Sequence, residues 1–240
     1  MDLFDSELRV IAAAEELVHG LGSDENHTVA AAAMDTTGRI HTGVNVCHFT
    51  GGPCAELVVI GVAAAAHAGP LVTIAAAGDQ DRGLLAPCGR CRQVILDLHP
   101  DALVAVPDVT TSEPSIAPIS SLLPQAYRHP DSAPERLLRF HARYFDTVRN
   151  GSKTLTVRWS EGHRTGPALA YFENTEHGTL PVEVASVTVK RLDALRPEDL
   201  DLTRPGGLEQ YIGNLRDHYP AMPADANVEI LRFRRTAADI

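Results

Sequence analysis

The sequence of 240 residues has few aromatic side chains, few cysteines and no excess of basic residues. Phe, Trp and Tyr make up 5% of the chain, so broad platforms that stack nucleic-acid bases are not expected. Lys and Arg number 21 against 31 Asp and Glu, and the net charge of -10 disfavours a protein whose whole surface grips nucleic acid. No apolar run approaches the roughly 18 residues that a membrane-spanning helix needs.

The N-terminus and the cysteines bear on the compartment. The segment MDLFDSELRV is acidic from its second residue and therefore does not resemble a secretory signal. We expect a cytoplasmic protein with no membrane partner. Four cysteines in such a chain favour metal binding or catalysis over disulfides.

A proline-rich stretch divides the chain. Six of the sixteen prolines fall between residues 107 and 135, a density that breaks regular structure and suits a boundary or an extended connector. We place the boundary near Asp131, with one domain over 1–130 and a second over 131–240. All four cysteines lie in the first domain.

Hydrophobic patterning predicts an α/β fold for the first domain and a smaller, mostly β domain with two helices for the second. The first domain should hold a mixed sheet covered by helices. Its expected elements are a helix over 6–18, a hairpin turning at 35–38, a helix over 54–69, a strand over 71–78, a helix over 88–99 and a strand over 102–107.

The cysteines form two short motifs. Cys54-Ala55-Glu56 is followed some thirty residues later by a Pro-Cys-x-x-Cys motif that contains Cys88 and Cys91. This combination resembles the signature of zinc-dependent nucleobase deaminases. Both motifs begin predicted helices, and the positive end of a helix lowers the pKa of a thiol.

Three thiolates would leave one position of a tetrahedral zinc ion for water, which marks a catalytic rather than a structural site. Glu56, two residues after Cys54, is expected to relay protons between that water, the ring nitrogen and the leaving ammonia. Arg90 lies between two of the thiolates and would offset their negative charge. Zn²⁺ is therefore the expected cofactor.

Two other interpretations of the cysteines remain open. Free cysteines are often simply buried, so the three thiols could be core residues without a metal. Alternatively, Cys47 could complete a closed structural zinc with four thiolates, which would leave Glu56 without a task.

The stretch from Gly38 to Pro100, with GVNVCHFTGGPCAELVV and PCGRCRQVILDLHP, resembles the blasticidin S deaminase branch of the cytidine deaminase family. The resemblance implies a three-layer α/β/α domain around a mixed five-stranded sheet, and a homo-oligomer, either a tetramer or a dimer. It implies hydrolysis of the cytosine ring of a nucleoside to uracil. The implied zinc ligands are Cys54, Cys88 and Cys91, with Glu56 as the acid/base.

The same resemblance implies contacts with the substrate. Asn45 matches the Asn of an Asn-x-Glu motif that holds ribose in cytidine deaminases, but Cys47 stands in place of the Glu. Thr28 and Arg82 match polar groups on the substrate side, and Arg82 is either a partner for a substrate carboxylate or a solvated loop residue. Tyr127 resembles a C-terminal aromatic lid.

The segment Gly151-Ser152-Lys153-Thr154-Leu155-Thr156-Val157-Arg158 resembles the ASCH domain, a small β-barrel related to PUA RNA-binding modules, over about residues 137–236. The resemblance implies RNA binding, or hydrolysis of N4-acylcytidine by a lysine, a threonine and a glutamate. Lys153 and Thr156 match two of these residues. No acid aligns with the third, the nearest being Asp201, Glu198 and Glu209. Ordinary strand residues without a catalytic role are the alternative.

These observations predict a zinc-dependent hydrolase that deaminates cytosine nucleosides and carries a second domain of unassigned role. Two rivals remain. One is a cytosine deaminase that acts on RNA delivered by the barrel. The other is a non-enzymatic RNA-binding module with a structural zinc.

Overall fold

The computed structural model describes residues 3–127, 133–173 and 177–236. The chain divides into two compact units, Met1–Ala142 with Tyr171–Thr179 and Arg143–Ala170 with Leu180–Ile240. The boundary expected near Asp131 lies outside the described residues and stays a prediction. No helix in the described ranges is long and apolar enough to cross a membrane.

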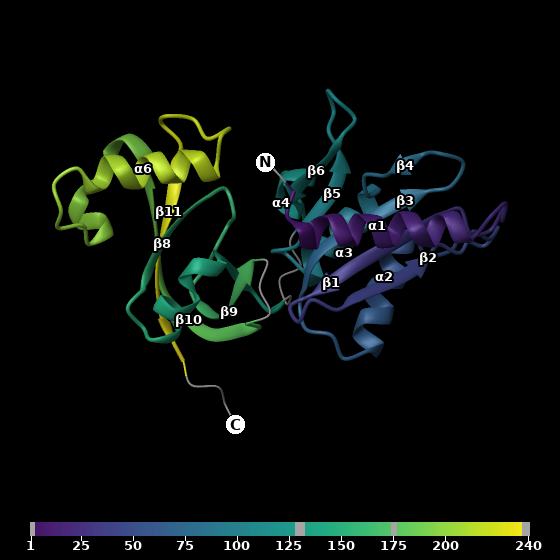
Figure 1. The fold of residues 1–240 in the computed structure, drawn as a ribbon, viewed down its shortest axis with the longest axis horizontal. Helices are drawn as coiled ribbons and strands as arrows, with labels where there is room; N and C mark the ends of the chain where they lie inside the picture. Colours follow the sequence, from purple (N-terminus) through teal and green to yellow (C-terminus); the bar gives the residue numbers. More distant parts are fainter. Residues whose placement is uncertain (1–2, 128–132, 174–176, 237–240) are drawn as a thin grey trace. The chain divides into compact units, whose positions relative to one another are not determined.

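The first sheet is mixed, as the sequence predicts (Figure 1). Its strands follow the order β2-β1-β3-β5-β6, and the short β4 pairs with β3. Only β3 and β5 run parallel among the pairs described. The strands are β1 (Val29–Asp35), β2 (Ile40–Val44), β3 (Leu71–Gly78), β4 (Gly83–Leu84), β5 (Leu103–Pro107) and β6 (Pro114–Pro118).

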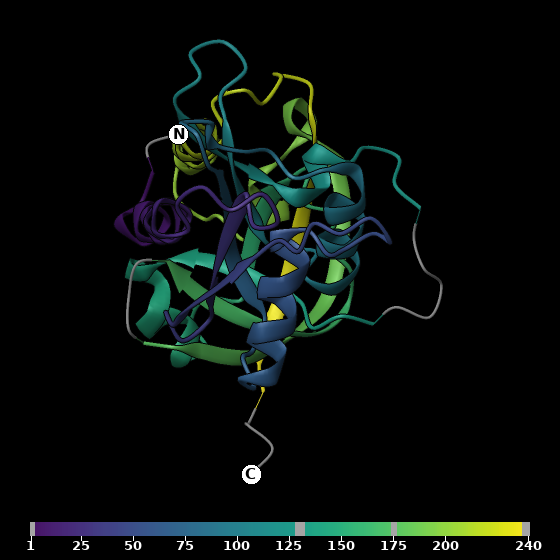
Figure 2. The same cartoon turned by 90° about the vertical axis from the view of Figure 1, so that its right-hand side faces the viewer.

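Helices cover both faces of this sheet (Figure 2). Helix α1 (Asp5–Gly20) packs on β1 and β3, while α2 (Ala55–Ala65) and α3 (Gly89–Leu98) share a core with Ala31, Ala33 and Ile74. The four alanines of β1 are fully buried, and every residue of β3 is buried. Because a strand covered on both faces has no solvated side, its sequence is continuously apolar rather than alternating.

The predicted hairpin joins β1 to β2. The Asp35 carboxylate accepts hydrogen bonds from the backbone N–H of Thr37 (2.8 Å) and Arg39 (3.2 Å), and lies 3.0 Å from Nε2 of His41. Burial alone would raise the pKa of Asp35, but these hydrogen bonds outweigh it and lower the pKa to about 2. The buried carboxylate therefore fixes the turn.

The proline-rich stretch is more ordered than the sequence suggests. Pro114–Pro118 forms β6, which pairs antiparallel with β5, and α4 (Ile119–Leu122) follows. The expectation that this stretch breaks regular structure is wrong over residues 114–122. Proline is tolerated at the ends of an edge strand because the missing N–H costs no ladder hydrogen bond there.

The second sheet follows the order β7-β9-β10-β11-β8 and is an open path over the residues that the structure describes. A closed barrel therefore stays a prediction. The two helices expected in the second domain correspond to α5 (Phe145–Arg149) and α6 (Gly207–His218). The strands are β7 (Leu137–His141), β8 (Leu155–Trp159), β9 (Gly166–Glu173), β10 (Thr179–Arg191) and β11 (Asn227–Arg235), with 3-10 turns at Ala142–Tyr144, Leu192–Ala194 and Pro197–Leu200.

Candidate active site

Three thiols meet where two helices of the first unit begin. Cys54 and Cys88 occupy the N-cap positions of α2 and α3, and Cys91 lies in the first turn of α3. The Sγ atoms of Cys54 and Cys88 are 3.8 Å apart, and those of Cys88 and Cys91 are 3.5 Å apart. All three Sγ atoms lie within 4.8 Å of one another.

The donor set fits zinc. With Zn–S bonds of about 2.3 Å, tetrahedral geometry places two thiolates roughly 3.8 Å apart, close to the separations seen here. Among the described residues, this is the one group of three or more Cys, His, Asp or Glu side chains arranged to hold a metal ion. Cys54, Cys88 and Cys91 would hold the ion.

The three thiols differ in acidity. Burial raises the pKa of Cys91, and the negative charge of Glu56 raises it further. Burial raises the pKa of Cys54 as well. Burial also acts on Cys88, but backbone N–H groups of Cys91 and Arg90 at the helix start outweigh it and lower the pKa. Without a cation nearby, the three thiols do not readily lose their protons together, because each negative charge opposes the next.

Glu56 lies in the first turn of α2 and is 6% exposed. It follows the N-cap Cys54 by two residues, and its negative charge contributes to the raised pKa of the thiols of Cys54 and Cys91. A carboxyl group buried beside a metal-binding cluster can exchange protons with a bound reactant without competing with bulk water.

Cys47 lies outside the cluster. Its side chain is exposed, and its backbone N–H donates to the carbonyl of Asn26 at 2.8 Å. Over the described residues, the metal-binding group consists of three thiols without Cys47.

Asn45, directly after β2, organises the backbone at the start of β1. Its Oδ1 accepts hydrogen bonds from the backbone N–H groups of Thr28 and Val29, both at 2.8 Å. Its Nδ2 lies 3.5 Å from the carbonyl of Asn26. The structure therefore brings Asn45 and Thr28 together, but the amide oxygen of Asn45 is used by the protein itself.

The other two expected substrate contacts are placed differently. Arg82 forms an ion pair with Asp79 and donates to the carbonyl of Thr28, so its guanidinium is engaged within the unit. The side chain of Tyr127 is 68% exposed, and its carbonyl accepts a hydrogen bond from Gln93 at 3.0 Å.

Sequence reasoning missed Arg92. Its Nε donates to the carbonyl of Pro87 at 2.8 Å, directly before Cys88, and its Nη1 donates to the carbonyl of Leu122 at 3.0 Å. Arg90, on which the sequence analysis concentrated, is exposed. The sequence offered one indication of Arg92, its position directly after Cys91 on the helix that begins with Cys88 and Cys91.

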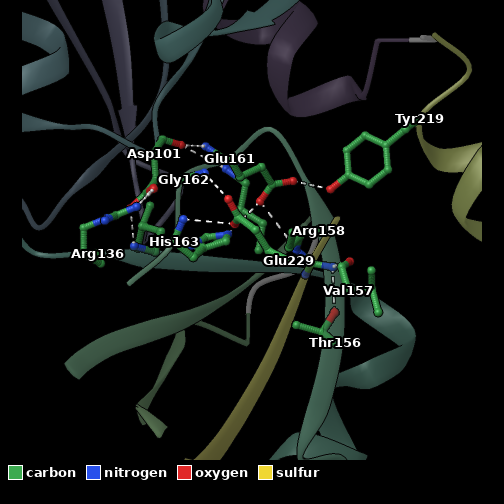
Figure 3. Close-up of polar contacts among 12 residues, drawn as sticks. Asp101, Arg136, Thr156, Val157, Arg158, Glu161, Gly162, His163, Tyr219 and Glu229 are labelled. Carbon is green, nitrogen blue, oxygen red and sulfur yellow. Dashed lines mark hydrogen bonds and ion pairs between the residues drawn. The ribbon is translucent and has the colours of Figure 1, made fainter. Parts of the chain in front are cut away.

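A second polar cluster lies in the second unit (Figure 3). The Glu161 carboxylate accepts hydrogen bonds from Tyr219 and lies 2.8 Å from Nε2 of His163 and 3.5 Å from Nε of Arg158. Arg158 in turn donates from Nη1 to Oγ1 of Thr156 at 2.7 Å. Burial raises the pKa of Glu161, but these partners outweigh it and lower the pKa to about 2.

This arrangement links Thr156 to a carboxylate that the sequence did not indicate. Of the acids considered there, Asp201 pairs with Arg232 at 2.6 Å and Glu198 lies 3.9 Å from Arg196. Glu209 lies in the first turn of α6. The sequence did not indicate Glu161 because the contacts that join β8, the following loop and the end of α6 cannot be deduced from the spacing of residues along the chain.

The amine of Lys153, in the second unit, has a lowered pKa. Burial, and then the guanidinium groups of Arg158 and Arg143, lower its pKa to about 8. Its Nζ donates to the carbonyl of Leu155 at 3.0 Å and lies 4.5 Å from the centre of the Tyr144 ring. Thr156 is 3% exposed.

Known proteins resemble part of the chain, up to about half of it. Blasticidin-S deaminase of Bacillus cereus is 31% identical over 114 residues, which are 44% of this chain and 81% of that protein. Cytidine deaminase of Mycobacterium tuberculosis is 41% identical over 71 residues, 29% of this chain and 53% of the relative. No family model matches the chain.

Solved structures of the same kind are similar over the same extent. The crystal structure of cytidine deaminase from Mycobacterium tuberculosis is 30% identical with a TM-score of 0.42, over 50% of this chain and 95% of that one. Its counterpart from Burkholderia pseudomallei is 28% identical with a TM-score of 0.42, over 50% of this chain and 98% of the other. On the strength of the blasticidin-S deaminase match, the chain belongs to the family of blasticidin-S and cytidine deaminases.

Proposed function

We propose that this protein is a zinc-dependent hydrolase that deaminates the cytosine ring of a nucleoside to uracil and releases ammonia. The observation that carries the proposal is the group of three thiols at two helix starts with Glu56 buried beside them. Cytidine and an aminoacyl nucleoside of the blasticidin S type are the two candidate substrates, since relatives of both names match part of the chain.

The residues divide the work between them. Zinc, when bound by Cys54, Cys88 and Cys91, supplies a Lewis acid that makes water nucleophilic at neutral pH. Glu56 accepts a proton from the attacking water and delivers it to the ring nitrogen. A second proton transfer through Glu56 lets the exocyclic nitrogen leave as ammonia. One water is consumed for each ammonia released.

The substrate contacts remain part of the proposal. Thr28 and Asn45 lie together, and the Nδ2 group of Asn45, which donates one N–H to the carbonyl of Asn26, has a second N–H for a ligand. Arg82 contributes by holding Asp79 and the Thr28 carbonyl rather than by meeting a substrate carboxylate. Tyr127 acts as a lid over bound nucleoside, for which its exposed ring is available.

We also propose a homo-oligomer, a dimer or tetramer. The exposed side of α2 carries no charged residue and consists of Gly61, Val62, Ala64 and Ala65. Phe49, in the loop before Cys54, is 93% exposed. Apolar surface of this kind is typical of a face that meets another subunit.

A second activity is proposed for the second unit, removal of an acyl group from N4 of cytosine. The lowered pKa of Lys153 favours it, because an amine that titrates near pH 8 is partly neutral and can act as a base. The burial of Thr156 and its bond from Arg158 favour Lys153 over Thr156 as the reacting group. RNA is the alternative ligand of this unit, and the net charge of -10 weighs against it.

Ammonia release from cytidine, deoxycytidine, blasticidin S and a short RNA tests the deaminase. We expect release from a free nucleoside and about one zinc per chain bound by three sulfurs and one oxygen. Release from RNA alone would support the RNA-directed rival. No release, together with a zinc bound by four sulfurs in X-ray absorption, would support the structural-zinc rival.

Incubation with N4-acetylcytidine tests the second activity. The intact protein should yield cytidine and then uridine, a Glu56→Gln variant should accumulate cytidine, and Lys153→Ala should leave the substrate intact. Deamination of another nucleoside without any product from N4-acetylcytidine would disprove the second activity alone.

A further inference from the structure

The segment that follows β6 lies against the helix that carries two of the thiols. This segment, Ile119–Tyr127, begins with α4 and ends at the expected lid residue. Leu122, Leu123 and Ala126 pack against the core that contains Cys91 and Ile95. The apolar contacts bring the segment to α3, but they do not fix its position along the helix.

Arg92 supplies that fixed position. Its guanidinium donates through Nε to the carbonyl of Pro87 (2.8 Å) and through Nη1 to the carbonyl of Leu122 (3.0 Å). The first carbonyl belongs to the residue that delivers Cys88 to the start of α3, and the second to the last residue of α4. A planar guanidinium with several donors can serve two carbonyls at once, whereas a single ammonium group is far less suited to this geometry.

Gln93 binds the same segment at its other end. Its Nε2 donates to the carbonyl of Tyr127 (3.0 Å) and to the carboxylate of Asp97 (2.9 Å). Unlike Arg92, Gln93 has its contacts with the segment and with its own helix, not with the turn before Cys88. The two neighbours therefore provide a natural comparison.

We propose that Arg92 is a positioning residue that couples the thiol cluster to the segment ending at Tyr127. By holding both the Pro87 carbonyl and the Leu122 carbonyl, it makes the placement of Cys88 and the docking of the segment depend on each other. This inference rests on the proposed function, in which the cluster holds zinc and Tyr127 covers a nucleoside.

A coupling role for Arg92 and a merely structural role predict different effects of its substitution. A structural role would lower stability and leave the zinc site and the segment unchanged in the folded protein. A coupling role changes both in the folded protein, because hydrogen bonds to the backbone around metal ligands commonly alter metal affinity by about 10–100-fold. A variant that affects only the segment should leave the zinc site unchanged.

The experiment compares Arg92→Met, Arg92→Lys and Gln93→Met in the full chain loaded with zinc. Arg196→Met is the charge-matched control, since the Arg196 side chain is 73% exposed in the second unit. Three quantities are measured: the rate of zinc release to an excess of chelator, the rate of chymotrypsin cleavage between residues 119 and 127, and KM against kcat for the nucleoside that is deaminated. Circular dichroism confirms that each variant is folded.

We expect Arg92→Met to release zinc about 10-fold faster, to be cleaved faster and to raise KM by roughly 2–10-fold, the worth of one hydrogen bond. Arg92→Lys should fall between Arg92→Met and the wild type. Gln93→Met should show faster cleavage and raised KM with unchanged zinc release. Arg196→Met should match the wild type in all three.

Wild-type zinc release or wild-type protection of the segment in folded Arg92→Met would overturn the coupling. The coupling would also be overturned if Gln93→Met released zinc as fast as Arg92→Met. Loss of a contact with the segment alone would then be enough to weaken the zinc site. If the wild-type protein deaminates no nucleoside, the proposed function fails, while zinc release and cleavage still decide whether Arg92 couples the two features.

Discussion

The two polar clusters of this protein are built on opposite principles. In the first unit, three thiols and the Glu56 carboxyl group are gathered at two helix starts, and burial raises the pKa of Cys54 and Cys91. In the second unit, Glu161 is surrounded by Tyr219, His163 and Arg158, and its pKa is lowered to about 2. The carboxylate cluster contains its own cation, Arg158, whereas the thiols and Glu56 are all groups that become anionic when they lose a proton.

The difference teaches where chemistry is to be expected. A buried cluster whose groups satisfy one another stabilises a loop and has little left to offer a ligand. A cluster of groups that cannot all ionise without a cation is costly to keep, unless a metal ion completes it.

The largest effect is expected at Glu56. Glu56→Gln keeps the size of the side chain but cannot relay protons, so turnover should fall by about 10²–10⁴ while zinc is retained. Ammonia release and zinc content are measured on the same preparation. Turnover close to that of the wild type would remove Glu56 from the proposed mechanism, and loss of zinc would assign it to the metal site instead.

The sequence predicted the thiol site better than the carboxylate cluster, for a physical reason. Cys54, Cys88 and Cys91 sit at helix starts, and helix starts are visible in local patterning. The link between Glu161 and Tyr219 joins a loop to the end of α6, a contact that no local pattern encodes.

Local patterning also decides which elements of the fold the sequence predicted and which it missed. The apolar runs of β3 and α2 predicted their elements because burial on all sides leaves a continuous apolar sequence. Strand β6 was missed because prolines mark both of its ends, and only its pairing with β5 makes it a strand. The backbone role of Asn45, whose amide oxygen binds two N–H groups across the hairpin, was not visible in the sequence, and its contact with substrate stays a prediction.

The next largest effect is expected at Arg139, which forms an ion pair with Glu173 in the first unit. Its side chain is 16% exposed, pairs with Glu173 at 2.7 Å and donates to the carbonyls of Asp101 and Val72. Arg139→Met should destabilise the protein by about 3–5 kcal/mol, because it leaves the Glu173 carboxylate without its buried partner. Urea denaturation measures the change.

Glu173→Gln with Arg139→Met in one chain sharpens this test. If the buried charge is the cause, the double variant should recover part of the stability lost in Arg139→Met. A double variant that is as unstable as the sum of both single variants would show that packing, not charge, makes Arg139 important.

A smaller effect is expected in the second unit. Glu161→Gln removes the charge that Arg158 and His163 face, and should cost about 1–3 kcal/mol of stability. Deamination by the first unit should be unchanged, because Glu161 plays no part in the thiol cluster. Asp201→Asn is the matched control, since Asp201 pairs with Arg232 at the surface. A loss of zinc or of deamination in folded Glu161→Gln would contradict the separation of the two clusters.

The smallest effect is a dependence on pH that originates outside both clusters. His99 ends α3, and its Nδ1 accepts the backbone N–H of Leu71 at 3.3 Å, which requires a neutral ring. Burial lowers its pKa from the ordinary 6.5 to about 4. The unfolded chain therefore binds more protons than the folded chain between these values, so the stabilisation is present above pH 6.5 and is lost as the pH falls toward 4.

At pH 5.5 the loss amounts to roughly 1.4 kcal/mol, because pH 5.5 lies one unit below the ordinary pKa of 6.5 and still above the lowered pKa. Urea denaturation of the wild type at pH 7 and pH 5.5 measures it, with His99→Gln as the variant and His19→Gln, in the last turn of α1, as the control. Other groups titrate in this range, but they do so equally in all three proteins. His99→Gln should therefore lose less stability on acidification than the other two proteins. An equal loss in all three would show that folding does not lower the pKa of His99.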